Sequence, residues 1–224
     1  MRVTVIEGHR IWAPSYDAGL NPLLALETRV LLDKLALFEG CRFLDVACGT
    51  GRWMQLARER GARVFGTDLC PEMLQRASRK ASLCGKLCLA DVCRVPFGDG
   101  MADFTFCSFA LGYVASPVRA IAEMARVTRQ GARVVVTDLH PSALAAGWTR
   151  SFRADGEVYE IDHHSHSAVA WEEAAGSAGL MLDWRIDANF AEPEREIFRQ
   201  AGKDSQFSEL SAIPAVLAMC WIKS

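Results

Sequence analysis

The residues best placed to do chemistry lie in one stretch, 43–53, which reads Phe-Leu-Asp-Val-Ala-Cys-Gly-Thr-Gly-Arg-Trp. Its apolar start, with Asp45 inside it, is typical of a buried parallel strand. Ala47, Gly49 and Gly51 then place small residues at alternate positions, where a backbone can turn sharply and approach a ligand. Helix-forming residues follow at once. In an open α/β sheet, such a strand, loop and helix bind a nucleotide-like ligand at the carboxyl end of the strand.

The loop differs from the two common nucleotide-binding loops. The dinucleotide fingerprint Gly-x-Gly-x-x-Gly requires a first glycine where Ala47 stands if it is aligned on position 47, and a third glycine where Met54 stands if it is aligned on Gly49. A phosphate loop requires Gly-Lys-Ser/Thr where Gly-Arg-Trp stands at 51–53. The carboxylate of Asp45 would repel a diphosphate and attract a positively charged group. These residues favour a cationic ligand, and the alternative is a glycine-rich turn in an unrelated α/β protein.

Segment 45–51, Asp-Val-Ala-Cys-Gly-Thr-Gly, resembles the first motif of class I methyltransferases that use S-adenosylmethionine (SAM), in the UbiE-like or "methyltransferase 11" branch. Residues 91–103 resemble the D-x-x-x-L-P-F-x-D-x-x-F-D run of that family, with Val95 and Ala102 as mild departures. Residues 123–131 resemble its helix-to-strand turn, with Gln130 in place of proline. The resemblance is carried by motifs over 40–140 and by the order of elements elsewhere.

The resemblance implies an α/β fold, a Rossmann-like three-layer sandwich whose seven-stranded sheet is mostly parallel with an antiparallel last strand. It implies one methyltransferase domain over 1–224. Within that domain, 1–40 form an arm and helix covering the pocket, 41–140 the SAM-binding core, and 141–224 a substrate-side insert and C-terminal hairpin.

Several elements can be expected from the residues themselves. Residues 1–20 show no period and suggest an ordered arm, whereas apolar spacing predicts a helix from Pro22 to Phe38. Runs of β-branched and apolar residues predict strands at 63–68, 86–91, 132–138 and 213–222.

The cofactor would bind at the ends of these strands. Asp68 stands 23 residues after Asp45, near the spacing at which an acid binds ribose hydroxyls, although it could instead cap the next helix. By resemblance, Asp91 and the backbone of Val92 bind adenine, and Tyr16 either touches SAM or substrate or anchors the arm. The expected cofactor-binding residues are Tyr16, Asp45, Ala47, Gly49, Gly51, Asp68, Leu69, Met73, Asp91, Val92, Ser108 and Phe109.

Four of the five histidines fall in the interval that related enzymes fold over the pocket. A histidine there is suited to general base catalysis. His140 is the first candidate because it follows a strand end directly, and His163 or His164 is the next, since alternation along a strand lets only one of those neighbours face inward. A mononuclear metal site is a third interpretation, but the spacing is not His-Glu-x-x-His and no metal is expected.

The amino-acid composition limits the kinds of molecule that the protein is expected to bind. The chain has 224 residues with a net charge of −2 and no basic block, which argues against nucleic acid and anionic membranes. It shows no signal-peptide pattern and no membrane-spanning run, so we expect a cytoplasmic protein. None of the eight cysteines forms a Cys-x-x-Cys pair. Cys84, Cys88 and Cys93 lie close together and are either ordinary thiols or a soft-metal or arsenic site.

The predicted reaction is SN2 transfer of the sulfonium methyl group to an O, N, S or C nucleophile of a small molecule. A base is needed for a hydroxyl or acidic carbon and can be dispensed with for an amine or thiol. The alternatives are a SAM-binding sensor or partner subunit that transfers no methyl group, a thiol-rich metalloid methyltransferase of the arsenite type, and a nucleotide-cofactor oxidoreductase. The sequence names neither the acceptor nor the oligomeric state.

Overall fold

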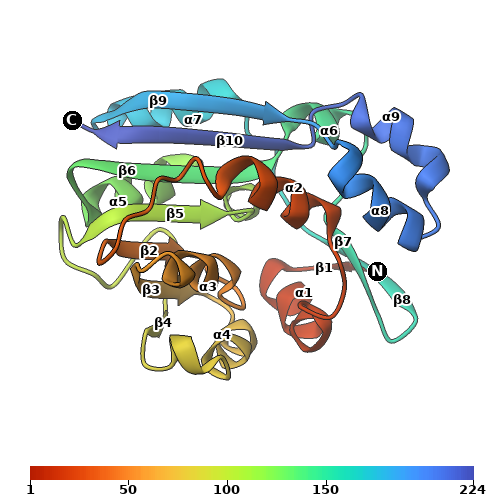
Figure 1. The fold of residues 1–224 in the computed structure, drawn as a ribbon, viewed down its shortest axis with the longest axis horizontal. Helices are drawn as coiled ribbons and strands as arrows, with labels where there is room; N and C mark the ends of the chain where they lie inside the picture. Colours follow the sequence, from red (N-terminus) through yellow and green to blue (C-terminus); the bar gives the residue numbers. More distant parts are fainter.

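Seven strands form the central sheet in the order β4-β3-β2-β5-β6-β10-β9 in the computed structural model, which describes residues 1–224 (Figure 1). The strands are β2 (Arg42–Val46), β3 (Arg63–Asp68), β4 (Leu87–Leu89), β5 (Ala102–Ser108), β6 (Thr128–Leu139), β9 (Leu180–Ala188) and β10 (Val216–Lys223). The first five run parallel, and β10 lies antiparallel between β6 and β9. The predicted fold class is therefore confirmed.

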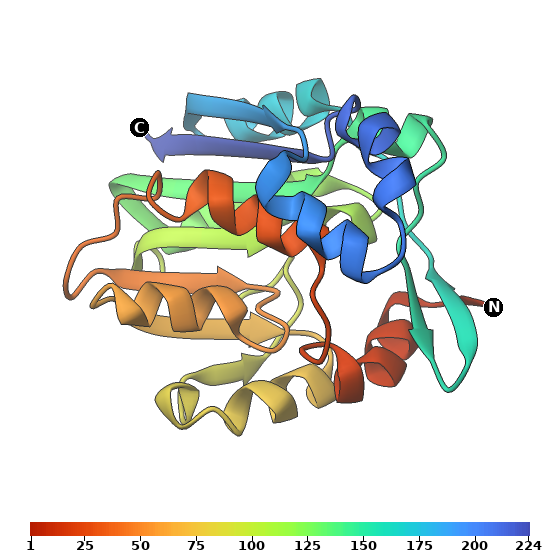
Figure 2. The ribbon, with the colours of Figure 1, turned by 45° about the vertical axis from the view of Figure 1, so that its right-hand side comes forward.

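Helices cover both faces of this sheet (Figure 2). They are α2 (Pro22–Leu31), α3 (Arg52–Glu59), α4 (Pro71–Ser78), α5 (Pro117–Val127) and α7 (Ala168–Ser177). Because side chains alternate along a strand, neighbouring residues pack on opposite faces. Phe43 of β2 packs with α2 and α3, whereas Leu44 packs with α5 and α7. The result is the three-layer sandwich expected from the sequence.

A second sheet of three short strands lies beside the carboxyl ends of the central strands, in the order β1-β8-β7 (Figure 1). It consists of β1 (Arg2–Val3), β7 (Ser151–Ala154) and β8 (Glu157–Ile161). Helix α1 (Val5–Trp12) leads from β1 toward the main sheet. The remaining helices lie in the second half of the chain: α6 (Pro141–Ala145), α8 (Glu192–Gln200) and α9 (Phe207–Ser211). No helix of the chain is long and apolar enough to cross a bilayer.

One helix was not predicted, and the end of another was predicted wrongly. Residues 1–20 contain helix α1. Its pattern of apolar residues cannot be recognised in the sequence because the helix has only eight residues and contains a glycine. That glycine, Gly8, is required by packing, since a Cβ there would lie 2.7 Å from Cγ1 of Ile161. Helix α2 ends at Leu31 rather than Phe38, because the chain turns through Ala36 with a left-handed φ of 48°, which a helix does not contain.

The bounds of three strands differ by a few residues from the predicted ones. The third strand is shorter than predicted, at Leu87–Leu89, and β6 begins at Thr128, before the predicted start at residue 132. Gly131 within β6 has a φ of 72°, so the early part of this strand is irregular. Apolar and polar residues do not alternate regularly there, and the sequence therefore does not indicate where the strand begins. Pro214 precedes β10, which begins at Val216.

Candidate active site

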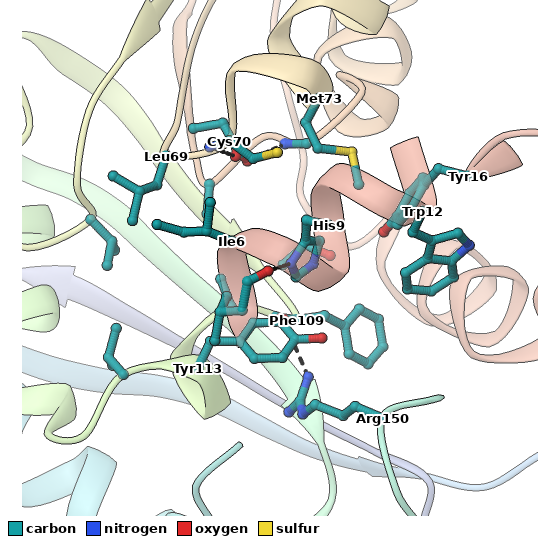
Figure 3. A pocket seen from close by; sticks show the side chains of 18 of the residues that line it. Ile6, His9, Trp12, Tyr16, Leu69, Cys70, Met73, Phe109, Tyr113 and Arg150 are labelled. Carbon is teal, nitrogen blue, oxygen red and sulfur yellow. Dashed lines mark hydrogen bonds between the residues drawn. The ribbon is translucent and has the colours of Figure 1, made fainter. Parts of the chain in front are cut away.

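A cavity of about 710 Å³ opens at the carboxyl edge of the parallel strands. Each of the five strands contributes to it, through Ala47 after β2, Asp68 of β3, Ala90 after β4, Ser108 of β5 and Leu139 of β6. Its volume is in the range of about 300–1,000 Å³ typical of small-molecule sites. Helix α1 lines the opposite side, so the cavity lies between the sheet edge and the N-terminal segment (Figure 3).

The loop after β2 is held in left-handed backbone conformations. Ala47, Gly49 and Gly51 have φ values of 60°, 54° and 81°. Gly51 is the residue before α3, and a Cβ there would collide with Cδ1 of Leu83. The loop thus needs small residues for two reasons, backbone conformation and close packing.

Asp68 fixes this loop from the neighbouring strand. Its Oδ2 accepts a hydrogen bond of 2.7 Å from the Gly49 N–H, and its Oδ1 accepts one of 2.8 Å from the Cys70 N–H. The carboxylate lines the cavity, where burial raises its pKa while these two N–H groups oppose the rise. The residue both shapes the loop and offers oxygen acceptors to a ligand.

Ten of the twelve expected cofactor-binding residues line the cavity together: Tyr16, Ala47, Gly49, Asp68, Leu69, Met73, Asp91, Val92, Ser108 and Phe109. Asp45 and Gly51 do not line it. Asp45 is buried in β2, its Oδ1 has no hydrogen-bond partner, and burial raises its pKa well above the usual range. Asp45 lies in β2 just before the loop and Gly51 ends the loop, so neither faces the cavity, contrary to expectation. Their role in binding the cofactor stays a prediction.

The three histidines expected to act as a base do not line the cavity. His140 is buried beside it as the N-cap of α6, where its Nδ1 accepts from the Ser142 N–H at 3.0 Å and its Nε2 lies 2.7 Å from Asp187 Oδ1. Both ring nitrogens are therefore occupied. His163 is held at the Ile161 carbonyl and His164 is exposed. The expected placement of these histidines was wrong because the path of residues 141–166 is set by the second sheet.

Two other polar residues reach the cavity instead: His9 from α1 and Arg150 from the segment before β7 (Figure 3). Arg150 pairs with the buried Asp138, and its guanidinium lies 4.6 Å from the centre of the Tyr113 ring. One feature of the sequence could have indicated His9: it is close to Trp12 in a segment expected to cover the pocket. Arg150 carried no local signal.

A buried carboxylate behind the cavity was also missed. Glu27 of α2 is fully buried and accepts hydrogen bonds from Arg52, Trp53 Nε1, Ser108 and Thr137. These four donors come from α3 and the ends of β5 and β6. Glu27 thus joins α2 to the elements that form the cavity wall, through Ser108 in particular.

The geometry gives no support to a metal site. No group of three or more His, Cys, Asp or Glu side chains is arranged to hold a metal ion in the chain. Cys84 is exposed, whereas Cys88 and Cys93 are half-buried, and the three thiols form no such group. The metalloid interpretation of this stretch therefore rests on sequence proximity alone.

Comparison with known proteins finds similarity to methyltransferases. A family model described as a methyltransferase domain matches residues 44–136. Demethylmenaquinone methyltransferase of Beutenbergia cavernae is 30% identical over 177 residues, covering 70% of this chain and 71% of that protein. Malonyl-[acyl-carrier protein] O-methyltransferase of Serratia marcescens is 34% identical over 148 residues, covering 65% of this chain and 56% of that protein.

Among solved structures, the putative methyltransferase in complex with the Trm112 methyltransferase activator of Haloferax volcanii is similar in fold. Its TM-score is 0.74 at 21% identity, covering 98% of this chain and 97% of that chain. The chain spans between 48% and 63% of the length of the first four curated relatives.

The cavity at the strand ends, the small-residue loop and these similarities together define a class of protein. The chain belongs to the class I SAM-dependent methyltransferases, in their UbiE-like branch. SAM is accordingly its cofactor.

Proposed function

We propose that the protein transfers the methyl group of SAM to a small-molecule nucleophile. The observation that carries this proposal is that ten expected cofactor-binding residues line one cavity. The same cavity has a second wall, formed by α1, Tyr113 and Arg150, where an acceptor could bind. A cavity with both parts can align a methyl donor and an acceptor, and alignment is the main contribution a protein makes when the leaving group is already good.

The cofactor would lie against the sheet edge. Asp68 has two carboxylate oxygens for the ribose hydroxyls, and Asp91 and the Val92 backbone would bind adenine, with Leu69 and Met73 against its faces. Ala47, Gly49, Ser108 and Phe109 would surround the methionine part, and Tyr16 would close the site from the N-terminal arm. Asp45 would act indirectly, because its buried carboxyl lies in β2 just before the loop.

The three segments have separate tasks in this proposal. Residues 1–40 cover the pocket, 41–140 bind SAM, and 141–224 supply the substrate side and the C-terminal hairpin. We place the protein in the cytoplasm and expect no nucleic acid partner, because the net charge is −2 and no basic block occurs in the sequence.

Calorimetric titration with SAM, S-adenosylhomocysteine and NAD tests the cofactor. Micromolar binding of the two adenosyl compounds without NAD, about −8 kcal/mol, is expected. Binding of NAD alone, or of none of the three, would contradict the proposal.

Release of S-adenosylhomocysteine then tests transfer. The acceptors should include a reduced demethylmenaquinone analogue and a malonyl thioester, because two similar proteins are named for such acceptors. Hydroxylated arenes, thiols and amines complete the panel. SAM binding with no transfer to any acceptor would favour the sensor or partner-subunit alternative.

A further inference from the structure

His9 is the one histidine whose ring lines the cavity. Its Nδ1 lies 2.8 Å from the carbonyl oxygen of Val5, one helical turn earlier. Because a carbonyl only accepts, Nδ1 must carry the proton of the neutral ring, and Nε2 therefore keeps its lone pair. No hydrogen bond to a protein group is made by Nε2. The helix fixes the tautomer and leaves one nitrogen free to accept a proton.

Arg150 brings a positive charge to the same part of the cavity. Its side chain is only 8% exposed, and its two terminal nitrogens are used by Asp138 and, at 3.3 Å, by the Phe109 carbonyl. Its Nε–H is buried without any partner. Since this nitrogen has almost no accessible surface, Arg150 acts on the cavity through its positive charge rather than through a free N–H.

Tyr113 connects the two groups. The His9 ring packs edge-to-face on the Tyr113 ring at 5.0 Å, and the Arg150 guanidinium lies over the same ring at 4.6 Å. Figure 3 shows His9, Tyr113 and Arg150 gathered at one end of the cavity, with Ile6 close to His9. This end combines apolar and aromatic walls with one free acceptor and one positive charge.

We propose that this end of the cavity takes a small, largely apolar acceptor with an ionisable hydroxyl group on a conjugated ring, and that His9 is its general base. The inference rests on the proposed methyl transfer. The hydroxyl proton moves to His9 Nε2, and the oxygen lone pair forms the bond to the methyl carbon. The carbon–sulfur bond breaks and its electron pair stays on sulfur, which leaves a methyl ether, S-adenosylhomocysteine and a protonated His9. The positive charge of Arg150 stabilises the negative charge that develops on the acceptor oxygen.

The surroundings of His9 suit this task. The charged or titratable groups facing it are Asp68 at the end of β3, Arg150 before β7 and Tyr113 between β5 and α5. Burial lowers the His9 pKa below its usual 6.5, Asp68 opposes that change and Arg150 adds to it. The ring is therefore neutral, and able to accept a proton, at pH 7.

The neighbouring groups are less suited to be the base. Burial raises the pKa of Tyr113, so its phenol keeps its proton near neutral pH. Arg150 stays charged because Asp138 and Tyr113 lie against it.

The test measures methylation of 1-naphthol, catechol and hydroquinone by the full chain at saturating SAM. His9→Gln keeps the size of the ring but cannot take up a proton near neutral pH. We expect kcat to fall about 10²- to 10⁴-fold with an unchanged SAM Kd. Wild-type kcat should rise to a plateau through a pKa below 6.5, whereas His9→Gln should lose the plateau and rise with hydroxide. Arg10→Gln, an exposed neighbour on the same helix, is the control and should match wild type.

Two further measurements separate a base from a structural role. Added imidazole should restore turnover to His9→Ala, which a merely packed histidine would not allow. Arg150→Gln removes the positive charge and should lower kcat with a smaller effect on the SAM Kd.

An unchanged rate and pH profile in His9→Gln overturns the inference, and so does a wild-type enzyme that methylates thiols or amines but none of the hydroxyl acceptors. A wild-type protein that binds SAM and methylates nothing refutes the proposed function itself, so the two failures are distinguishable.

Discussion

The backbone N–H of Gly49 donates a 2.7 Å hydrogen bond to Asp68 Oδ2. This bond ties the loop after β2 to the end of β3, two elements separated by the whole of α3. Because Cys70 N–H donates to the other carboxylate oxygen, one side chain sets both the loop and the start of α4. The residue proposed to hold the ribose thus also holds the loop that would surround the methionine part.

Replacing Asp68 should therefore weaken cofactor binding strongly. Asp68→Ala removes the proposed ribose acceptor and leaves the Gly49 N–H unpaired. We expect the SAM Kd to rise about 10- to 100-fold, or about 1.4–2.8 kcal/mol, in calorimetric titration. Asp99→Asn, in an exposed turn outside the cavity, is the control. An unchanged Kd would remove Asp68 from the cofactor site.

Changing Gly49 or Gly51 of the loop to alanine should affect different properties, SAM binding in the first case and stability in the second. A Cβ at Gly49 meets no protein atom within 4 Å and Gly49 lines the cavity, so Gly49→Ala should impair SAM binding more than stability. Its left-handed φ adds about 1 kcal/mol of strain. A Cβ at Gly51 collides with Leu83, so Gly51→Ala should instead lower the free energy of unfolding by about 1–3 kcal/mol. Urea unfolding and SAM titration on both variants measure the contrast. Equal losses of affinity and stability in the two would contradict it.

The sequence could predict which residues line the cavity at the strand ends because these signals are local. An apolar run, small residues at 47, 49 and 51, and an acid at the next strand end are all readable within one βαβ unit, and parallel strands bring their ends to one edge. That is why Asp68, Asp91 and Ser108 meet in the cavity although they lie far apart in the chain.

The acceptor side could not be predicted in the same way. His140 follows a strand end, as expected, but its ring turns to cap α6 and contact Asp187 of β9, a residue 47 positions later. His9 lies on a helix too short to show a period, and it reaches the cavity because Gly8 packs on Ile161 of the second sheet. Such tertiary contacts leave no periodic trace in the sequence.

Glu27 should be more important for stability than any exposed ion pair. Glu27→Ala leaves Arg52 and three other donors without their shared acceptor in a buried site, and breaking a buried pair costs about 3–5 kcal/mol. Thermal unfolding should show a large fall in Tm. In Asp33→Asn, which breaks an ion pair with Arg60 at a fully exposed carboxylate, the loss should be below about 1 kcal/mol. Similar Tm values for the two variants would show that the buried network contributes little.

His140 should affect stability rather than transfer. His140→Ala removes the acceptor of the Ser142 N–H at the start of α6, and loss of an N-cap costs about 1 kcal/mol. It also removes a partner of Asp187, whose pKa is lowered first by Arg185 and then by His140. A carboxylate with a lowered pKa stabilises the fold above its unfolded pKa of about 4, and this contribution is lost as the pH falls through the lower folded value. The stability gap between wild type and variant should therefore be largest near neutral pH and narrow below about pH 4. Urea unfolding across this range measures the gap, with the exposed His164→Ala as control. If His140→Ala instead kept its stability and lost methyl transfer with SAM binding intact, His140 would regain the role of base and His9 would lose it.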